Sequence, residues 1–281
     1  MKPSLAMWRR LSQAAAAIAF IIIPILNARG SLLISGNLIS LDFFGLTFVD
    51  PLAFLQTLAG GPPTAKAATG AALVLVMALI LGRVFCGWVC PYGLASELVL
   101  ALRGRRKTQI SPAAGGGLRP LAVRSAVAGL GLLIALLFLP EPWLNQFSMP
   151  GWYSKVFQLA VFSGAPPFGA LIFPALLILE GFIGKRVWCR YLCPQSVSLA
   201  LAAHCLPRGF GVKWSPGRCS CRGSALPPCQ TACSLGLTAR QANGPPRSEC
   251  FQCAECVSIC AKHGAALKLG GVDRVTEAHI Q

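Results

Sequence analysis

The sequence predicts an α-helical membrane protein: four transmembrane helices, built as two duplicated helix pairs, followed by a small cysteine-rich cytoplasmic domain. Hydrophobic residues make up 54% of the 281 residues and charged residues 12%, about half the charged share of a typical globular chain. The apolar residues fall in long blocks, and eight of the thirteen cysteines lie between residues 219 and 260. We therefore expect a membrane domain over residues 1–205 and a cytoplasmic domain over 206–281.

Four apolar stretches are long enough, or nearly so, to cross the hydrocarbon core as helices, which takes about 20 residues. They are Leu11–Leu26, Ala67–Phe85, Leu121–Leu139 and Phe168–Ile183. The fourth stretch contains one acid, Glu180, which we expect near the helix end. It has two interpretations: an interfacial glutamate paired with Lys185, Arg186 or Arg190, or a residue that handles protons.

Lys and Arg residues alternate in number along the chain. The N-terminus has three, the loop 27–66 two, the loop 83–124 seven, the loop 140–166 one, and the tail from residue 185 twelve. Because cations collect on the cytoplasmic side, we expect a multi-pass protein of the bacterial inner membrane with both termini in the cytoplasm. The same cations account for the net charge of +16, so no nucleic-acid partner is expected. Arg9 and Arg10 before a short apolar run are also typical of a signal peptide.

The loop 27–66 is more apolar than a solvated loop. Residues 38–58 are rich in Leu and Phe and contain two acids, Asp42 and Asp50. We expect this segment to lie in the outer interface or to enter the bundle as short helices.

An internal repeat carries the first chemical signal. Residues 83–93 (RVFCGWVCPYG) match residues 186–196 (RVWCRYLCPQS), each directly after a predicted span. The two cysteines of each copy are four apart, so on a continuing helix they would face one direction, and the following proline can begin the next helix. Two interpretations are open: these thiols pack as small hydrophobes, or they act in redox chemistry or ligation. We favour the second for Cys86, Cys90, Cys189 and Cys193.

The tail carries the second signal. Residues 250–260 (CFQCAECVSIC) have the spacing C-x2-C-x2-C-x3-C, which is that of a bacterial ferredoxin cluster motif. Upstream, an irregular C-x-C-x7-C-x3-C runs from Cys219 to Cys233. In two-cluster ferredoxins the fourth cysteine of each motif ligates the other cluster. We therefore expect two [4Fe–4S] clusters, one held by Cys250, Cys253, Cys256 and Cys233, and the other by Cys219, Cys221, Cys229 and Cys260. Zinc is the alternative metal, but structural zinc sites usually space two separate pairs widely.

Together these features resemble a known family. Four spans, two C-x3-C-P motifs after the second and fourth, and a C-terminal two-cluster segment resemble the NapH/MauN-type membrane ferredoxin-like proteins. Residues 49–60 (VDPLAFLQTLAG) also match that pattern. The irregular first cluster motif, with Ser234 and Ala261 where ferredoxins usually have proline, favours the MauN type, which belongs to methylamine utilisation.

The resemblance implies electron transfer. In this family, quinol in the membrane is oxidised, and electrons pass through the clusters to another redox protein, here the methylamine dehydrogenase system or a similar one. The chain would then be a component of a quinol dehydrogenase. Three alternatives stay open: a redox maturation factor for a periplasmic dehydrogenase, NapH-like quinol oxidation for nitrate reduction, and a non-redox metal-binding membrane anchor.

Overall fold

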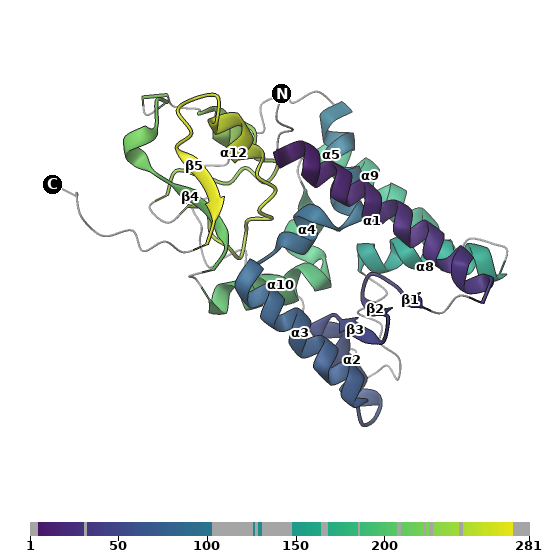
Figure 1. Ribbon diagram of the computed structural model, residues 1–281. Coiled ribbons are helices and arrows are strands. Elements are labelled where there is room, and N and C mark those ends of the chain that lie inside the picture. Colours follow the sequence, from purple (N-terminus) through teal and green to yellow (C-terminus); the bar gives the residue numbers. More distant parts are fainter. Residues whose placement is uncertain are drawn as a thin grey trace.

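The computed structural model describes residues 5–30, 33–102, 126, 129–130, 148–163, 168–184, 186–206, 209–221, 223–224, 227–241 and 244–271. Helices from the first two thirds of the chain pack into a bundle, and the C-terminal segment forms a separate unit beside it with few regular elements (Figure 1). The first helix, α1, runs across the bundle and places its N-terminus next to this C-terminal unit (Figure 1).

Among the described residues, α1 (Leu5–Ala28, 24 residues) is long and apolar enough to cross a bilayer, and it covers the first predicted span. The second predicted span is α3 (Ala65–Leu81), which has 17 residues. The fourth becomes a 3₁₀ turn, η2 (Phe168–Leu171), followed by α9 (Ile172–Ile183), which has 12 residues. The third, Leu121–Leu139, lies outside the described residues. Because a span takes about 20 residues, the four-span topology stays a prediction.

The apolar loop before α3 differs from the expectation. It forms an antiparallel three-stranded sheet of β1 (Ile34–Gly36), β2 (Ser40–Phe43) and β3 (Leu46–Val49), and only then a helix, α2 (Pro51–Gly60). The expectation of short helices was therefore correct for α2 and wrong for the three strands. A two-residue turn joins β2 to β3, and both of its residues, Phe44 and Gly45, have positive φ, as in the turns that favour tight hairpins.

The sheet lies directly against α3. A Cβ atom placed on Gly70 would stand 2.3 Å from the backbone oxygen of Thr47, so only glycine allows strand and helix to come this close. Behind this contact, Ile39, Val49 and Ala71 share one small core. The loop between the first two predicted spans is thus packed onto the bundle.

The remaining bundle elements are shorter than α3, and two of them begin at a proline. They are α4 (Val84–Trp88), α5 (Pro91–Leu102), α8 (Met149–Ser163), the π-helical η3 (Trp188–Leu192) and α10 (Pro194–Cys205). The helix α3 starts where the hydroxyl of Thr64 accepts from the backbone N–H of Ala67, and it ends at Gly82, whose φ is 68°. These boundaries place the repeated cysteine motifs in the turns between helices.

The C-terminal unit is closed by a two-stranded antiparallel sheet. Strand β4 (Gly211–Trp214) pairs with β5 (Leu267–Gly270), so both ends of the cysteine-rich segment meet. Between them lie a 3₁₀ turn, η4 (Pro216–Arg218), and two short helices, α11 (Pro228–Thr231) and α12 (Glu255–Cys260). The sheet starts five residues after the predicted domain boundary at 206.

An ion-pair cluster ties α1 to both parts of the fold. Arg9 is 1% exposed, and its guanidinium lies 2.7 Å from the carboxylate of Glu97 on α5 and 2.9 Å from that of Glu255 at the start of α12. Although burial acts to raise the pKa of Glu97, the hydrogen bonds from Arg9 hold that pKa at about 2. Glu97 is therefore ionised at neutral pH and fixes α1 against α5.

Candidate metal centres

Both C-x3-C-P motifs form the same tight turn. In the first, the backbone N–H of Cys90 donates to the carbonyl of Phe85 at 3.1 Å; in the second, that of Cys193 donates to Trp188 at 2.9 Å. Each bond spans five residues, so each motif ends in a π-turn. The second motif is π-helical over η3, whereas the first is α-helical over α4 before its π-turn. Each second cysteine then directly precedes the proline that opens α5 or α10, as predicted.

The two motifs come together inside the bundle. Cys90 and Cys189 belong to one buried core, against which Cys86 packs. Cys90 also lies within electrostatic reach of Cys86 and Cys193, and Cys189 within reach of Cys90 and Cys193. None of the described cysteines forms a disulfide bond. The repeat therefore gathers four thiols from two distant segments, as the duplication suggested.

The same core extends into the C-terminal unit. Phe251, Leu235 and Leu237 belong to it, and Cys233 and Cys250 pack against it. The first motif approaches so closely that a Cβ on Gly87 would stand 2.3 Å from the backbone oxygen of Phe251. Next to it, the indole Nε1 of Trp88 donates to the carbonyl of Gln252 at 3.1 Å. The motif thiols and the cysteine loop of the tail thus pack into one core.

Arg83 is a residue of this junction that the sequence analysis counted only as a cytoplasmic cation. It is fully buried and donates to four acceptors: the carbonyls of Cys189, Ser248 and Glu249 and the hydroxyl of Ser196. Its guanidinium also lies 4.4 Å from the ring centroid of Phe251. The sequence does contain a sign of this role, because an arginine begins both copies of the repeated motif R-V-aromatic-C. The matching Arg186 instead reaches Glu97 at 3.4 Å.

The regular tail motif lines a first hollow. Cys233, Cys250, Cys253 and Cys256 face it, which is the first ligand set predicted from crossed ferredoxin spacing. Two backbone N–H groups donate to sulfur, Leu237 to Cys233 at 3.4 Å and Gln252 to Cys250 at 3.3 Å. Gln252 and Ala254, which flank Cys253, have φ near +55°. This left-handed conformation is unfavourable for residues other than glycine, and it bends the loop around the hollow.

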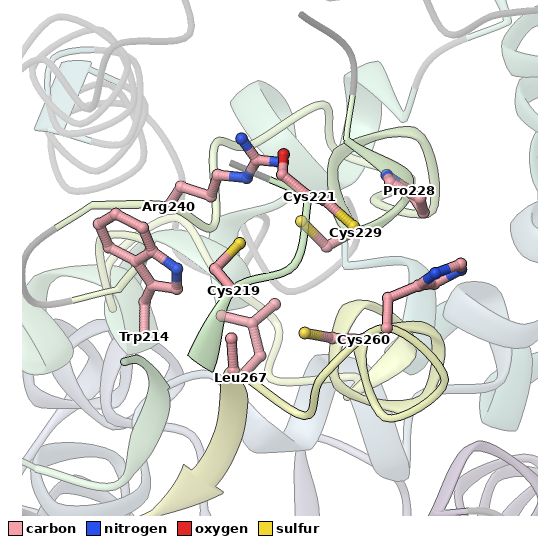
Figure 2. Close-up of a pocket in the computed structure, with 10 residues that line it drawn as sticks. Trp214, Cys219, Cys221, Pro228, Cys229, Arg240, Cys260 and Leu267 are labelled. Carbon is pink, nitrogen blue, oxygen red and sulfur yellow. The ribbon is translucent and has the colours of Figure 1, made fainter. Parts of the chain in front are cut away.

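The irregular motif lines a second hollow. Cys219, Cys221, Cys229 and Cys260 border it, and Figure 2 shows their sulfur atoms turned toward a common space beneath Arg240. The guanidinium of Arg240 donates to the carbonyl of Cys221 at 2.5 Å. The floor is apolar, with Trp214 and Leu267 (Figure 2). The irregular spacing between Cys221 and Cys229, where α11 begins, does not prevent these four cysteines from lining one hollow.

Each hollow offers four cysteine donors, the number that a [4Fe–4S] cluster takes. Among the described residues, no three His, Cys, Asp or Glu side chains are arranged as ligands of one metal ion. A [4Fe–4S] cluster takes one thiolate on each of four irons, so its donors surround a larger body. Burial raises the pKa of the Cys233, Cys250 and Cys256 thiols, because a bare thiolate would lose its hydration there. A cationic iron centre supplies the charge that such buried thiolates require.

Glu180 lies in the last turn of α9, near the helix end as predicted, and its role in handling protons stays a prediction. It is 2% exposed and accepts from the hydroxyl of Ser96 at 2.6 Å and from the backbone N–H of Trp188 at 2.9 Å. Arg186 and Arg190 pair with other carboxylates, Glu97 and Glu249, and Lys185 lies outside the described residues. In the described part of the chain, Glu180 therefore caps the turn of the second motif and is not seen paired with a cation.

Known proteins support the iron–sulfur interpretation. The profile of a family described as "4Fe-4S binding domain" matches residues 67–109 and 165–213, the two halves of the repeat. The protein NapH of Escherichia coli, a ferredoxin-type protein, is 27% identical over 79% of this chain and 75% of its own length. The methylamine utilisation ferredoxin-type proteins MauN of Paracoccus denitrificans and Methylorubrum extorquens are 32% and 30% identical, each over 66% of this chain.

The chain is a homologue of the ferredoxin-type proteins NapH and MauN. It spans 62% and 61% of the two MauN proteins, less than two thirds of their length. No solved structure matches it. In this NapH/MauN homologue the family profile contains the four motif cysteines and not the tail cysteines, so the 4Fe-4S description rests on the bundle and its repeat.

Proposed function

We propose that this NapH/MauN homologue is a bacterial inner-membrane protein that takes electrons from quinol in the bilayer and passes them through two [4Fe–4S] clusters to another redox protein. The observation that carries the proposal is the shared core of the repeat and the tail, in which Cys90 and Cys189 pack with Phe251 beside Cys250. Buried, contiguous packing of this kind keeps successive redox groups close and excludes water between them.

The chain's own residues would hold and order the clusters. The first hollow offers Cys233, Cys250, Cys253 and Cys256, and the second offers Cys219, Cys221, Cys229 and Cys260. When bound, each cluster supplies reversible one-electron transfer. N–H donors to sulfur and the cation of Arg240 favour the more negative, reduced state of the site they face. The four motif cysteines would act between the quinol and the first cluster.

The partner is proposed from the relatives' names. The MauN proteins are named for methylamine utilisation, and two of them are 32% and 30% identical to this chain over 66% of it, against 27% over 79% for NapH. A redox protein of methylamine oxidation is therefore the proposed recipient of the electrons. A maturation factor built from the same parts would also bind clusters, but quinol would not reduce those clusters.

Iron content tests the cluster assignment. We expect protein purified without oxygen to hold about eight irons, from two four-iron clusters. Replacing Cys253 with Ser should remove one of the four ligands of the first hollow and lower the iron content by roughly half. Cys205, which is exposed at the end of α10, provides the matched control, and Cys205→Ser should keep all the iron. Stoichiometric zinc in place of iron would exclude electron transfer.

Fusion reporters test the orientation. A reporter placed after Arg106 should report a cytoplasmic location, because seven cations lie in the loop 83–124. One placed after Ser163, at the end of α8, should report a periplasmic location, because the loop 140–166 has a single Lys or Arg. The reverse pair of signals would put both cysteine motifs on the wrong side for this function.

A further inference from the structure

A large apolar cavity lies on the other side of the first cysteine motif. It has a volume of about 340 Å³, within the usual range for small-molecule sites, and is bordered by α1, α3, α4, α10 and the sheet. Phe85 and Val89, which flank the first motif cysteines, form part of its wall. Among the described lining residues, two side chains are polar, Asp50 and Gln195.

Asp50 is a carboxyl group held in an apolar setting. It is 5% exposed, begins α2 as the helix cap, and accepts from the N–H of Ala53 at 3.3 Å and from the hydroxyl of Ser198 at 3.0 Å. A helix cap alone would favour the charged form and lower the pKa. Burial instead raises the pKa of Asp50 to about 6, although the bonds from Ser198 and the backbone N–H groups act in the opposite direction.

No charged neighbour produces this shift. The charged or titratable groups on the described elements around Asp50 are Asp42 on β2, Lys66 at the start of α3, and His204 and Cys205 at the end of α10, and none contributes to the shift. Asp50 can therefore change its protonation state near neutral pH through burial alone.

Gln195 brings an unused acceptor to the same cavity. Its side chain is 7% exposed, its Nε2 donates to the carbonyl of Leu38 at 3.5 Å, and its Oε1 is buried without a partner. A buried unpaired amide oxygen is costly, so a ligand hydroxyl that donates to it would be favoured. Gln195 also follows Pro194 of the second motif, and one turn later Ser198 holds Asp50. Helix α10, which begins at the second cysteine motif, thus carries Gln195 and also holds Asp50 through Ser198.

Such a site fits a flat apolar molecule with a hydroxyl donor. A lipid acyl chain would fill the volume but leave Oε1 of Gln195 unpaired. On the basis of the proposed function, we infer that this cavity binds quinol, that Gln195 accepts a hydrogen bond from one hydroxyl, and that the Asp50 carboxylate takes the proton of a hydroxyl as the quinol is oxidised.

The electrons and protons released when quinol is oxidised can be accounted for by the two proposed clusters and Asp50. Oxidation to quinone breaks two O–H bonds and releases two electrons and two protons. The electrons leave one at a time to the two [4Fe–4S] clusters, which are reduced by one electron each. The first proton forms an O–H bond on Asp50, which gives it to water and becomes ionised again before it takes the second.

The test variant is Asp50→Asn, because Asn caps a helix as well as Asp but cannot accept a proton. The full-length protein in liposomes is mixed with short-chain ubiquinol or menaquinol, and cluster reduction is followed by absorbance. Wild-type rates should rise as the pH increases through about 6, as Asp50 ionises. Asp50→Asn should lose this rise and react about 100-fold more slowly or worse at pH 7. Asp42→Asn, in the same loop, is the control and should behave as wild type.

A second measurement does not depend on activity. The raised pKa means that the folded state holds the Asp50 proton more tightly than the unfolded state does, so thermal stability should fall as the pH rises from about 4 to about 6. That fall should be smaller in Asp50→Asn, and the variant should be no less stable at pH 7. A pure capping role predicts the opposite slope.

The outcomes separate this inference from the proposed function. If wild-type clusters are reduced by quinol and Asp50→Asn reacts equally fast with the same pH profile, the cavity assignment is wrong and the proposed function stands. If dithionite but not quinol reduces the wild-type clusters, the proposed function itself fails. Crosslinking with an azido-quinone supplies a direct result: labels on residues 38–50 or 74–89 support the site, and labels confined elsewhere overturn it.

Discussion

Replacing Cys90 or Cys193 with Ser should abolish quinol-dependent cluster reduction while leaving about eight irons in the tail. Both cysteines are buried, with 6% of each exposed, and both end the π-turn of a motif. Val89, just before Cys90, and Gln195, two residues after Cys193, line the proposed quinol cavity. Cys90 also packs with Leu235 and Phe251, which line the first cluster hollow. Serine keeps the size and the polar character of the position, so the expected loss comes from the sulfur.

Two measurements on the same protein decide this prediction. Iron content reports the tail clusters, and the rate of reduction by quinol reports the path to them. If the four motif cysteines only pack, each serine variant should lose a little stability and keep its turnover. Cys205→Ser again serves as the control, because this exposed thiol belongs neither to the four motif cysteines nor to the cysteines of the two hollows. Full turnover in both motif variants would return these cysteines to a packing role.

Replacing Arg83 with Gln should separate the bundle from the C-terminal unit. The guanidinium serves four acceptors from both parts while fully buried, and glutamine cannot reach them all. Leaving two buried acceptors unpaired costs about 2–6 kcal/mol, and each kcal/mol lowers the melting temperature by roughly 2–4 °C. The loop before Cys250 should also lose its anchor, so the first cluster should become more sensitive to oxygen.

The internal repeat provides the control for Arg83. Arg186 occupies the same motif position and is also buried, but its guanidinium approaches Glu97 only to 3.4 Å, and Arg9 binds that carboxylate as well. Arg186→Gln should therefore lower the melting temperature less than Arg83→Gln, and it should leave the cluster hollow unchanged. Equal effects of the two changes would mean that Arg83 has no special role at the junction.

The local features of the motifs could be predicted from the sequence because they depend on neighbouring residues. Proline after each second cysteine opens a helix, and the spacing of the tail cysteines divides them into two foursomes. The shape of the turn could not be predicted, because a spacing of four residues is compatible with both α and π winding. Only the hydrogen bonds at Cys90 and Cys193 distinguish them.

The roles of Arg83 and Asp50 depend on contacts between distant segments. Arg83 meets carbonyls more than 100 residues away in sequence, and Asp50 meets Ser198 across 148 residues. From the sequence alone, Arg83 was one of the cations that predict the membrane orientation, and Asp50 was an acid in an apolar loop. The strands of that loop were missed for a related reason: short apolar runs fit a strand or a buried helix until packing decides.

The pairing of Arg9 sets an order for biogenesis. Its two acidic partners lie 88 and 246 positions later in the chain. Ribosomes add about 5–20 residues each second, so Glu255 emerges on the order of 12 to 50 seconds after Arg9. Glu97 is the partner in the interval and can hold the first helix in place. Because Glu255 stands between Cys253 and Cys256, the second ion pair closes only when the cysteine loop has wrapped. Placement of the first helix against α5 would thus precede the folding of the cysteine loop that follows β4.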